Sequence, residues 1–142
     1  MNGDVSPDGV WLAYESNTSG EFHVFVQLFG SAEGTRVQIS TSGGRQPRWA
    51  RSGTELFFFN ERGELMGVRV QGGAAFTAGT PTKILDAKYF NGGAYANART
   101  YDVARDGRFL MIKGSPNKDA SADRLVVVVN WREELKARLG PQ

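Results

Sequence analysis

The sequence predicts an all-β fold of short antiparallel strands, and three observations predict it. First, 18 of the 142 residues are Gly and 16 are aromatic (9 Phe, 4 Tyr and 3 Trp), a composition typical of short strands joined by tight turns. Second, a polar segment ending in Gly followed by an apolar run occurs three times, as "SPDGVWLAYESN" (6–17), "ARSGTELFFFNE" (50–61) and "ARDGRFLMIKG" (104–114). Third, the runs "LFFF" and "LVVVV" do not alternate with polar residues, which indicates strands buried on both faces.

The spacing of the repeat predicts its architecture. The turn glycines Gly9, Gly53 and Gly107 are 44 (53 − 9) and 54 (107 − 53) residues apart, and the first spacing matches the roughly 40–45 residues of a four-stranded β-propeller blade. The longer second spacing is explained by a loop insertion, "YFNGGAYANA" at 89–98. We therefore expect a single domain, 1–142, that forms a partial propeller of about three four-stranded antiparallel blades, at approximately 4–39, 46–86 and 100–131. A two-layer β-sandwich is the alternative.

Strands are expected in the same order in each unit. The first unit contains "GDVS" (3–6), "WLAYES" (11–16), "FHVFVQLF" (22–29) and "RVQIS" (36–40); the second contains 46–50, 55–60, 64–70 and 82–86; the third contains 100–104, 108–113 and 124–131. The third unit has no obvious fourth strand. Instead, "NWREELKARLG" predicts a short C-terminal helix at 131–139 that covers the outer edge of this unit.

The Asp-Gly pairs at 8–9 and 106–107 are expected to form turns. A tight hairpin needs a residue with positive φ, which Gly adopts without steric cost. In the middle copy Gly53 keeps this position and Ser52 replaces the Asp. A calcium loop is not expected, because acidic ligands at alternating positions are missing.

Composition and charge bear on several classes of function. The chain has no Cys and a formal net charge of only +2, so disulfides and thiolate chemistry are excluded and the clustered basic surface typical of nucleic-acid binding is not expected. The longest strongly apolar run, "LVVVV" at 125–129, is far shorter than the roughly 20 residues that span a membrane. No signal peptide is recognisable in "MNGDVSPDGV". We expect no nucleic-acid partner and no membrane insertion.

A search for catalytic or metal-binding residues predicts none, and no cofactor. His23 is the only His and there is no Cys, so a metal site is not expected, and no Ser lies in a Gly-x-Ser-x-Gly motif. The densest basic segment contains Arg45, Arg48 and Arg51. Because alternate strand positions face opposite sides, these side chains are expected at exposed strand ends rather than in one phosphate site.

The 89–98 insertion is the best candidate for a partner-binding loop. It combines aromatic and amide side chains in a segment that strand pairing does not require: Tyr89, Phe90, Asn91, Tyr95 and Asn97. Loops on a rigid scaffold often carry recognition residues, and aromatic anchors are typical of binding hot spots. The alternative is that this loop simply folds over the edge of a blade.

The segments "SPDGVWLAYESNTSGEFHVFVQLF", "ISTSGGRQPRWARSGTELFFFN" and "RTYDVARDGRFLMIK" resemble the WD40-like propeller repeat of TolB-type proteins. They are most similar to the C-terminal propeller of some bacterial serine/threonine kinase-type sensors. The matching positions are Pro47 and Trp49 in the strand, Ser6, Pro7, Asp8 and Gly9 in the turn, and Ser40, Thr41, Gly43 and Gly44 in the link between blades. The turn Pro is missing at Arg51 and Arg105.

This resemblance implies a non-catalytic module that binds a protein or peptide, as the C-terminal part of a larger sensor or scaffold. The alternative is the gating propeller of a prolyl-oligopeptidase-type serine peptidase, whose catalytic domain this sequence does not contain. Propellers close with about four to eight blades, so three blades leave apolar flanks. We therefore expect a homo-oligomer or attachment to further blades, and for a full-length parent the resemblance implies a periplasmic or extracytoplasmic location.

Overall fold

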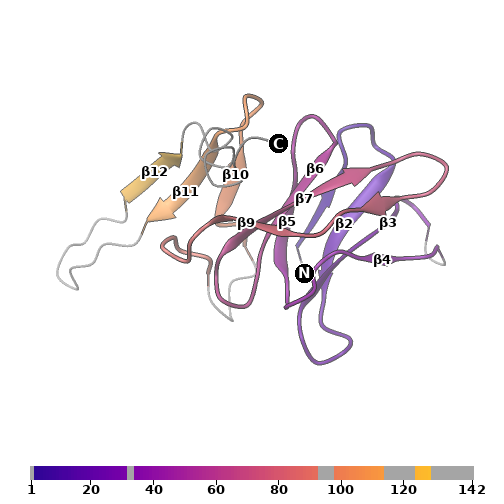
Figure 1. Cartoon of the computed structure of the whole chain (residues 1–142), viewed down its shortest axis with the longest axis horizontal. Helices are drawn as coiled ribbons and strands as arrows, with labels where there is room; N and C mark the ends of the chain where they lie inside the picture. Colours follow the sequence, from indigo (N-terminus) through magenta and orange to yellow (C-terminus); the bar gives the residue numbers. More distant parts are fainter. Residues whose placement is uncertain (1, 32–33, 93–97, 114–123, 129–142) are drawn as a thin grey trace.

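The fold is all-β and antiparallel, as the sequence predicts. The computed structural model of the chain describes residues 2–31, 34–92, 98–113 and 124–128, which form twelve strands and no helix. The predicted helix at 131–139 lies outside the described residues. The strands form three sheets, which follow one another across the molecule in sequence order (Figure 1).

Each sheet is a meander in which consecutive strands pair. The first sheet contains β1 (Gly3–Val5), β2 (Trp11–Ser16), β3 (His23–Leu28) and β4 (Val37–Gln38); the second contains β5 (Arg45–Trp49), β6 (Glu55–Phe59), β7 (Leu65–Gln71), β8 (Thr77–Ala78) and β9 (Thr82–Leu85); the third contains β10 (Tyr101–Val103), β11 (Phe109–Lys113) and β12 (Arg124–Val128). The predicted strands of all three units are therefore present. The described part of the third sheet has three strands, and not the four of a complete unit.

The last position of the second sheet differs from the prediction of one strand at 82–86. Two short strands occupy it: β9 pairs with the first half of β7, and β8 pairs with Val70 and Gln71. The physical reason for the break is the intervening "GTP" segment, 79–81, because Pro81 has no N–H to continue a ladder.

The three sheets form three layers, with one hydrophobic core between each pair of neighbouring sheets. The first core joins the first and second sheets, and its members include Trp11, Ala13, Val24, Val26, Trp49, Leu56, Phe58 and Val68. The second core joins the second and third sheets, and its members include Phe57, Phe59, Leu65, Ile84, Tyr101, Val103, Phe109 and Met111. Strand β6 contributes alternate residues to both cores, which explains why "LFFF" does not alternate with polar residues.

The three repeated turns have the same backbone conformation. Gly9, Gly53 and Gly107 all have positive φ, at 75°, 74° and 83°, as predicted for these hairpins. In each turn the preceding side chain accepts a hydrogen bond from the N–H two residues further on: Asp8 from Val10, Ser52 from Thr54 and Asp106 from Arg108. Ser therefore replaces Asp in the middle turn without loss of the hydrogen bond.

Candidate functional site

The first strands of the three sheets, β1, β5 and β10, meet along one side of the molecule, because β5 contacts both β1 and β10. We call them the leading strands. Each carries a charged residue five positions before its turn Gly: Asp4 before Gly9, Arg48 before Gly53 and Asp102 before Gly107. Equivalent positions of the repeat therefore present an acid, a base and an acid.

These three side chains form an ion-pair network across the three sheets. Arg48 Nη1 lies 2.9 Å from Asp4 Oδ1, and Arg48 Nη2 lies 2.7 Å from Asp102 Oδ1. Asp4 Oδ2 also accepts a hydrogen bond from the Trp49 backbone N–H at 2.9 Å. Arg99 adds a second cation, with Nη2 3.3 Å from Asp4 Oδ1 and a hydrogen bond to the Gly3 carbonyl. The network therefore links the leading strands of all three sheets.

The centre of this network is more buried than a typical surface ion pair. The side chains of Arg48 and Asp4 are 17% and 15% exposed, whereas that of Asp102 is 52% exposed. Burial raises the pKa of Asp102, but hydrogen bonds from Arg48 and the Val103 N–H and the charges of Arg48 and Arg51 outweigh it and hold that pKa below its ordinary value. Burial lowers the pKa of Arg48, but Asp102 and Asp4 outweigh it and raise that pKa overall. Arg48 and Asp102 are therefore both charged at neutral pH.

A second, uncharged connection between the sheets centres on Gln46. Its side-chain carbonyl accepts hydrogen bonds from the Thr100 N–H and hydroxyl at 2.9 and 3.0 Å, and its Nε2 donates to the Asn91 carbonyl at 2.8 Å. The buried Tyr101 hydroxyl donates to the Gln46 carbonyl at 2.9 Å. Burial raises the pKa of Tyr101 well above its ordinary value, so this hydroxyl stays protonated and keeps its donor.

The backbone of Gln46 is held in an unfavourable conformation by Glu15. Gln46 is the one non-Gly residue with positive φ, at 54°, in the described residues, and it lies where the pairing of β5 with β6 shifts register. The buried carboxylate of Glu15 accepts hydrogen bonds from the Gln46 N–H at 2.8 Å and from the N–H and side-chain amide of Asn2 at 3.2 and 3.0 Å. Such strain persists where surrounding contacts over-determine it.

The three arginines of the basic segment have separate environments, as their spacing predicts. The guanidinium of Arg45 lies 4.1 Å from the ring centroid of Phe22, Arg48 lies in the ion-pair network, and Arg51 lines a small cavity. The expectation that these side chains lie at exposed strand ends is wrong for Arg48. It is buried because the leading strands of neighbouring sheets converge on it.

The single His lies beside a Ser. His23 Nδ1 is 3.2 Å from both Ser40 Oγ and Gln38 Nε2, and its Nε2 is 3.9 Å from a carboxylate oxygen of Glu21. Ser40 is only 1% exposed, and its Oγ accepts a hydrogen bond from the Val24 N–H at 3.0 Å. A substrate carbonyl has no path to a hydroxyl buried in this way, so the pair serves to connect β3 with the segment after β4.

The described part of the 89–98 loop divides into packing and exposed residues. Tyr89 packs against the second core, whereas Phe90 is 51% exposed. The Phe90 N–H donates to the Ile112 carbonyl at 2.8 Å, and the Asn91 carbonyl accepts from Gln46. Tyr95 and Asn97 lie outside the described residues. The loop therefore begins as an ordered segment that presents Phe90 to solvent near the start of β5.

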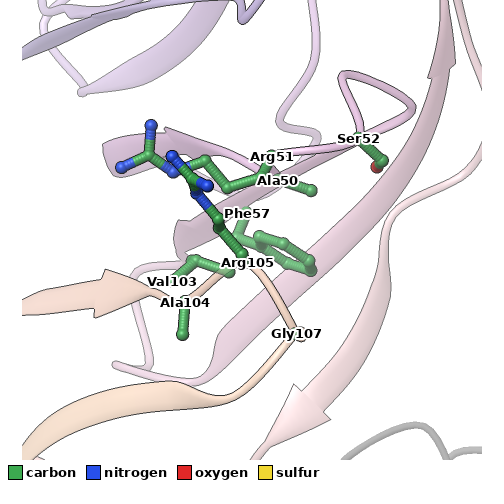
Figure 2. Close-up of a pocket in the computed structure, with 8 residues that line it drawn as sticks. All are labelled: Ala50, Arg51, Ser52, Phe57, Val103, Ala104, Arg105 and Gly107. Atoms are coloured by element: carbon green, nitrogen blue, oxygen red, sulfur yellow. The ribbon is translucent and has the colours of Figure 1, made fainter.

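A small cavity of about 30 Å³ lies at the other end of the leading strands (Figure 2). Two of the repeated turns form it, the one after β5 and the one after β10. It is lined by Ala50, Arg51, Ser52, Phe57, Val103, Ala104, Arg105 and Gly107.

Comparison with models of known protein families gives no match, and comparison with curated protein sequences gives none either. Among the described residues, no three His, Asp or Glu side chains are grouped closely enough to hold a metal ion. The same part of the chain contains no helix with the length and apolar character to cross a membrane.

The charged network was missed at the sequence level, although a signal for it exists. Asp4, Arg48 and Asp102 are separated by 44 (48 − 4) and 54 (102 − 48) residues, the same intervals as the turn glycines. Aligning the charges of the three units, and not only their turns, reveals an acid, a base and an acid at one repeated position. Opposite charges at equivalent positions of neighbouring units predict an ion pair between them.

Proposed function

We propose that this chain is a non-catalytic β-propeller module that binds a protein or peptide partner, as the C-terminal part of a larger sensor or scaffold. The observation that carries the proposal is the succession of three antiparallel meanders whose leading strands lie next to one another. In a propeller, radially repeated sheets pack face to face around a central axis lined by their first strands. The two cores between successive sheets and the ion pairs between leading strands support this proposal.

The exposed faces of the outer sheets support a continuation of the stack. In the first sheet, residues that alternate with the core face form a second face, which includes Val5, Leu12 and Tyr14. Val5 is 37% exposed and Leu12 and Tyr14 are half-buried. A repeat stack loses the stabilisation of one interface where such an apolar sheet face stays uncovered, so we propose that this face is covered by a second copy or by further blades.

The segment from Tyr89 to Asn91 is the proposed site of contact with the partner. Phe90 is an exposed aromatic side chain on a fixed backbone, because its own N–H donates to the Ile112 carbonyl and the carbonyl of the next residue, Asn91, accepts from Gln46. A rigid, exposed aromatic ring loses little conformational entropy on binding, which is the property of a hot-spot anchor.

Selection of peptides from a displayed library on the immobilised chain, followed by fluorescence anisotropy with the selected peptides, tests this function. We expect F90S to weaken peptide binding at least about tenfold, corresponding to roughly 1.4 kcal/mol, with no change in Tm. The matched control is F29S, because Phe29 is equally exposed, at 55% against 51%, but lies on the first sheet side of the molecule. Equal effects of the two substitutions would contradict the assignment of this site.

A further inference from the structure

Arg51 and Arg105 occupy equivalent positions in two neighbouring turns. Each lies two residues before its turn Gly, where the first turn has Pro7. Both line the cavity between the second and third sheets, and in Figure 2 their side chains extend to the same side of it. Two cations from different sheets therefore face one small cavity.

The acidic groups nearby form their ion pairs with other cations. Within the described ranges of the chain, neither Arg51 nor Arg105 forms an ion pair. Asp102 is close enough for the charge of Arg51 to lower its pKa, but its Oδ1 is already bound by Arg48. Asp106 pairs with Arg108 at 2.8 Å. Arg51 and Arg105 are both exposed, so their guanidinium groups are accessible to an anion.

The cavity itself selects the kind of anion. Its floor is apolar, because it is formed by Phe57 and Val103, whose side chains are 1% and 4% exposed. Its volume of about 30 Å³ gives room for a small group, on the order of one or two water molecules in size. Ser52 adds one hydroxyl to the wall. A ligand that fits has a negatively charged head for the guanidinium groups and a short aliphatic stem for the apolar floor.

We propose that Arg51 and Arg105 bind a carboxylate on a short aliphatic stem, supplied by an acidic segment of a protein partner. The guanidinium group is planar and matches the two oxygens of a carboxylate. A phosphoryl group also pairs with guanidinium groups, but it is the weaker candidate because it has no apolar part to fill the cavity. The site lies at the opposite end of β5 from Gln46 and Asn91, so it is separate from the proposed Phe90 contact.

Titration of the whole chain with sodium propionate, followed by ¹H–¹⁵N NMR, tests this inference. Propionate carries the proposed carboxylate and stem, and the amides of Ser52, Gly53 and Gly107 report on the site. We expect these amides to shift saturably with a Kd of about 1 to 10 mM at low ionic strength, where exposed charges are least screened. Propionamide, which has the same shape but no charge, is expected to give no saturable shift.

Matched variants separate the site from general charge effects. We expect R51Q and R105Q each to weaken propionate binding at least fivefold, and R105K to weaken it less. R62Q, which removes an exposed turn Arg at the opposite end of the second sheet, is expected to leave the Kd unchanged. The inference is overturned if the shifts do not saturate, or if R51Q and R62Q behave alike. Tighter binding of inorganic phosphate than of propionate at equal ionic strength would overturn the assignment of a carboxylate.

Discussion

The guanidinium of Arg48 donates two hydrogen bonds to the same oxygen of Asp102: Nε lies 2.9 Å and Nη2 lies 2.7 Å from Oδ1. Its third nitrogen, Nη1, donates to Asp4 Oδ1 at 2.9 Å. A single side chain therefore links all three sheets, in addition to the two apolar cores and the hydrogen bonds that Gln46 forms with Glu15 and Thr100. Because hydrophobic packing is non-directional, these hydrogen bonds supply a fixed alignment that the two cores do not.

Replacement of Arg48 by Ala is expected to lower the free energy of unfolding by about 2 to 3 kcal/mol, because it leaves the mostly buried Asp4 with only Arg99 as a charged partner. Urea denaturation followed by Trp fluorescence measures this change. The control is R108A, which removes an exposed pair with Asp106 and is expected to change the free energy of unfolding far less, because water screens exposed ion pairs. Similar values for the two variants would contradict the structural role of Arg48.

The contribution of Asp102 to stability is expected to depend on pH. Its pKa in the folded chain lies below its ordinary value, whereas the unfolded chain titrates near about 3.9. The stabilisation is therefore fully present above pH 4 to 5 and is lost as the pH falls through the folded-state pKa. With a discount for its half-exposed side chain, D102N is expected to cost about 1 kcal/mol at pH 7.

Unfolding curves of the wild-type chain and D102N between pH 7 and pH 3 test this dependence. The difference between the two proteins should stay constant down to about pH 5 and shrink below about pH 4. In the R48A background, D102N is expected to have a smaller effect, because the main partner is already missing. A difference that grows on acidification would contradict the assigned direction of the pKa shift.

At position 46, Gly is expected to be less destabilising than Ala, which reverses the usual order of these two residues in a strand. Both Q46A and Q46G lose the side-chain hydrogen bonds to Thr100 and Asn91. Only Gly adopts the φ of 54° without steric cost, so Q46G is expected to be more stable than Q46A by about 1 kcal/mol. Thermal unfolding of the two variants gives the comparison, and a more stable Q46A would show that this backbone conformation is not retained in solution.

The outer face of the first sheet is expected to mediate association. The wild-type chain should form oligomers at about 100 μM, because an uncovered apolar face of several hundred Å² favours burial. Leu12 lies opposite Val5 and Gln27 in the sheet register and is not part of the first core, so L12E places a charge on this outer face. Light scattering is expected to find L12E monomeric, while V10E, a change in the exposed turn, keeps the wild-type mass. A monomeric wild-type chain would contradict this proposal.

The strands could be predicted from the sequence because their signals are local. The turn glycines, the Asp or Ser side chains that accept from the N–H two residues on, and the dense aromatic runs are all found within a few residues of one another. The burial of both faces of β6 could also be predicted, because "ELFFF" leaves no polar face. The division of the last strand of the second sheet follows from Pro81, a signal that was present but not used.

The site depended on contacts between units, which local patterns do not contain. Arg48 lies in an ordinary-looking strand, and its burial depends on residues 44 positions before it and 54 positions after it (48 − 4 and 102 − 48). The positive φ of Gln46 depends likewise on Glu15, a buried acid on another sheet. The aromatic character of the 89–98 loop was visible, but only the structure separates the packed Tyr89 from the exposed Phe90.

The alternation of charge along the leading strands dictates the order in which the three units can be joined. Exchanging the first and second units by genetic permutation would make Asp4 the neighbour of Asp102, so that two carboxylates met with no guanidinium between them. Repulsion between the two carboxylates would destabilise the permuted chain, so three charged side chains favour the observed order of the three units.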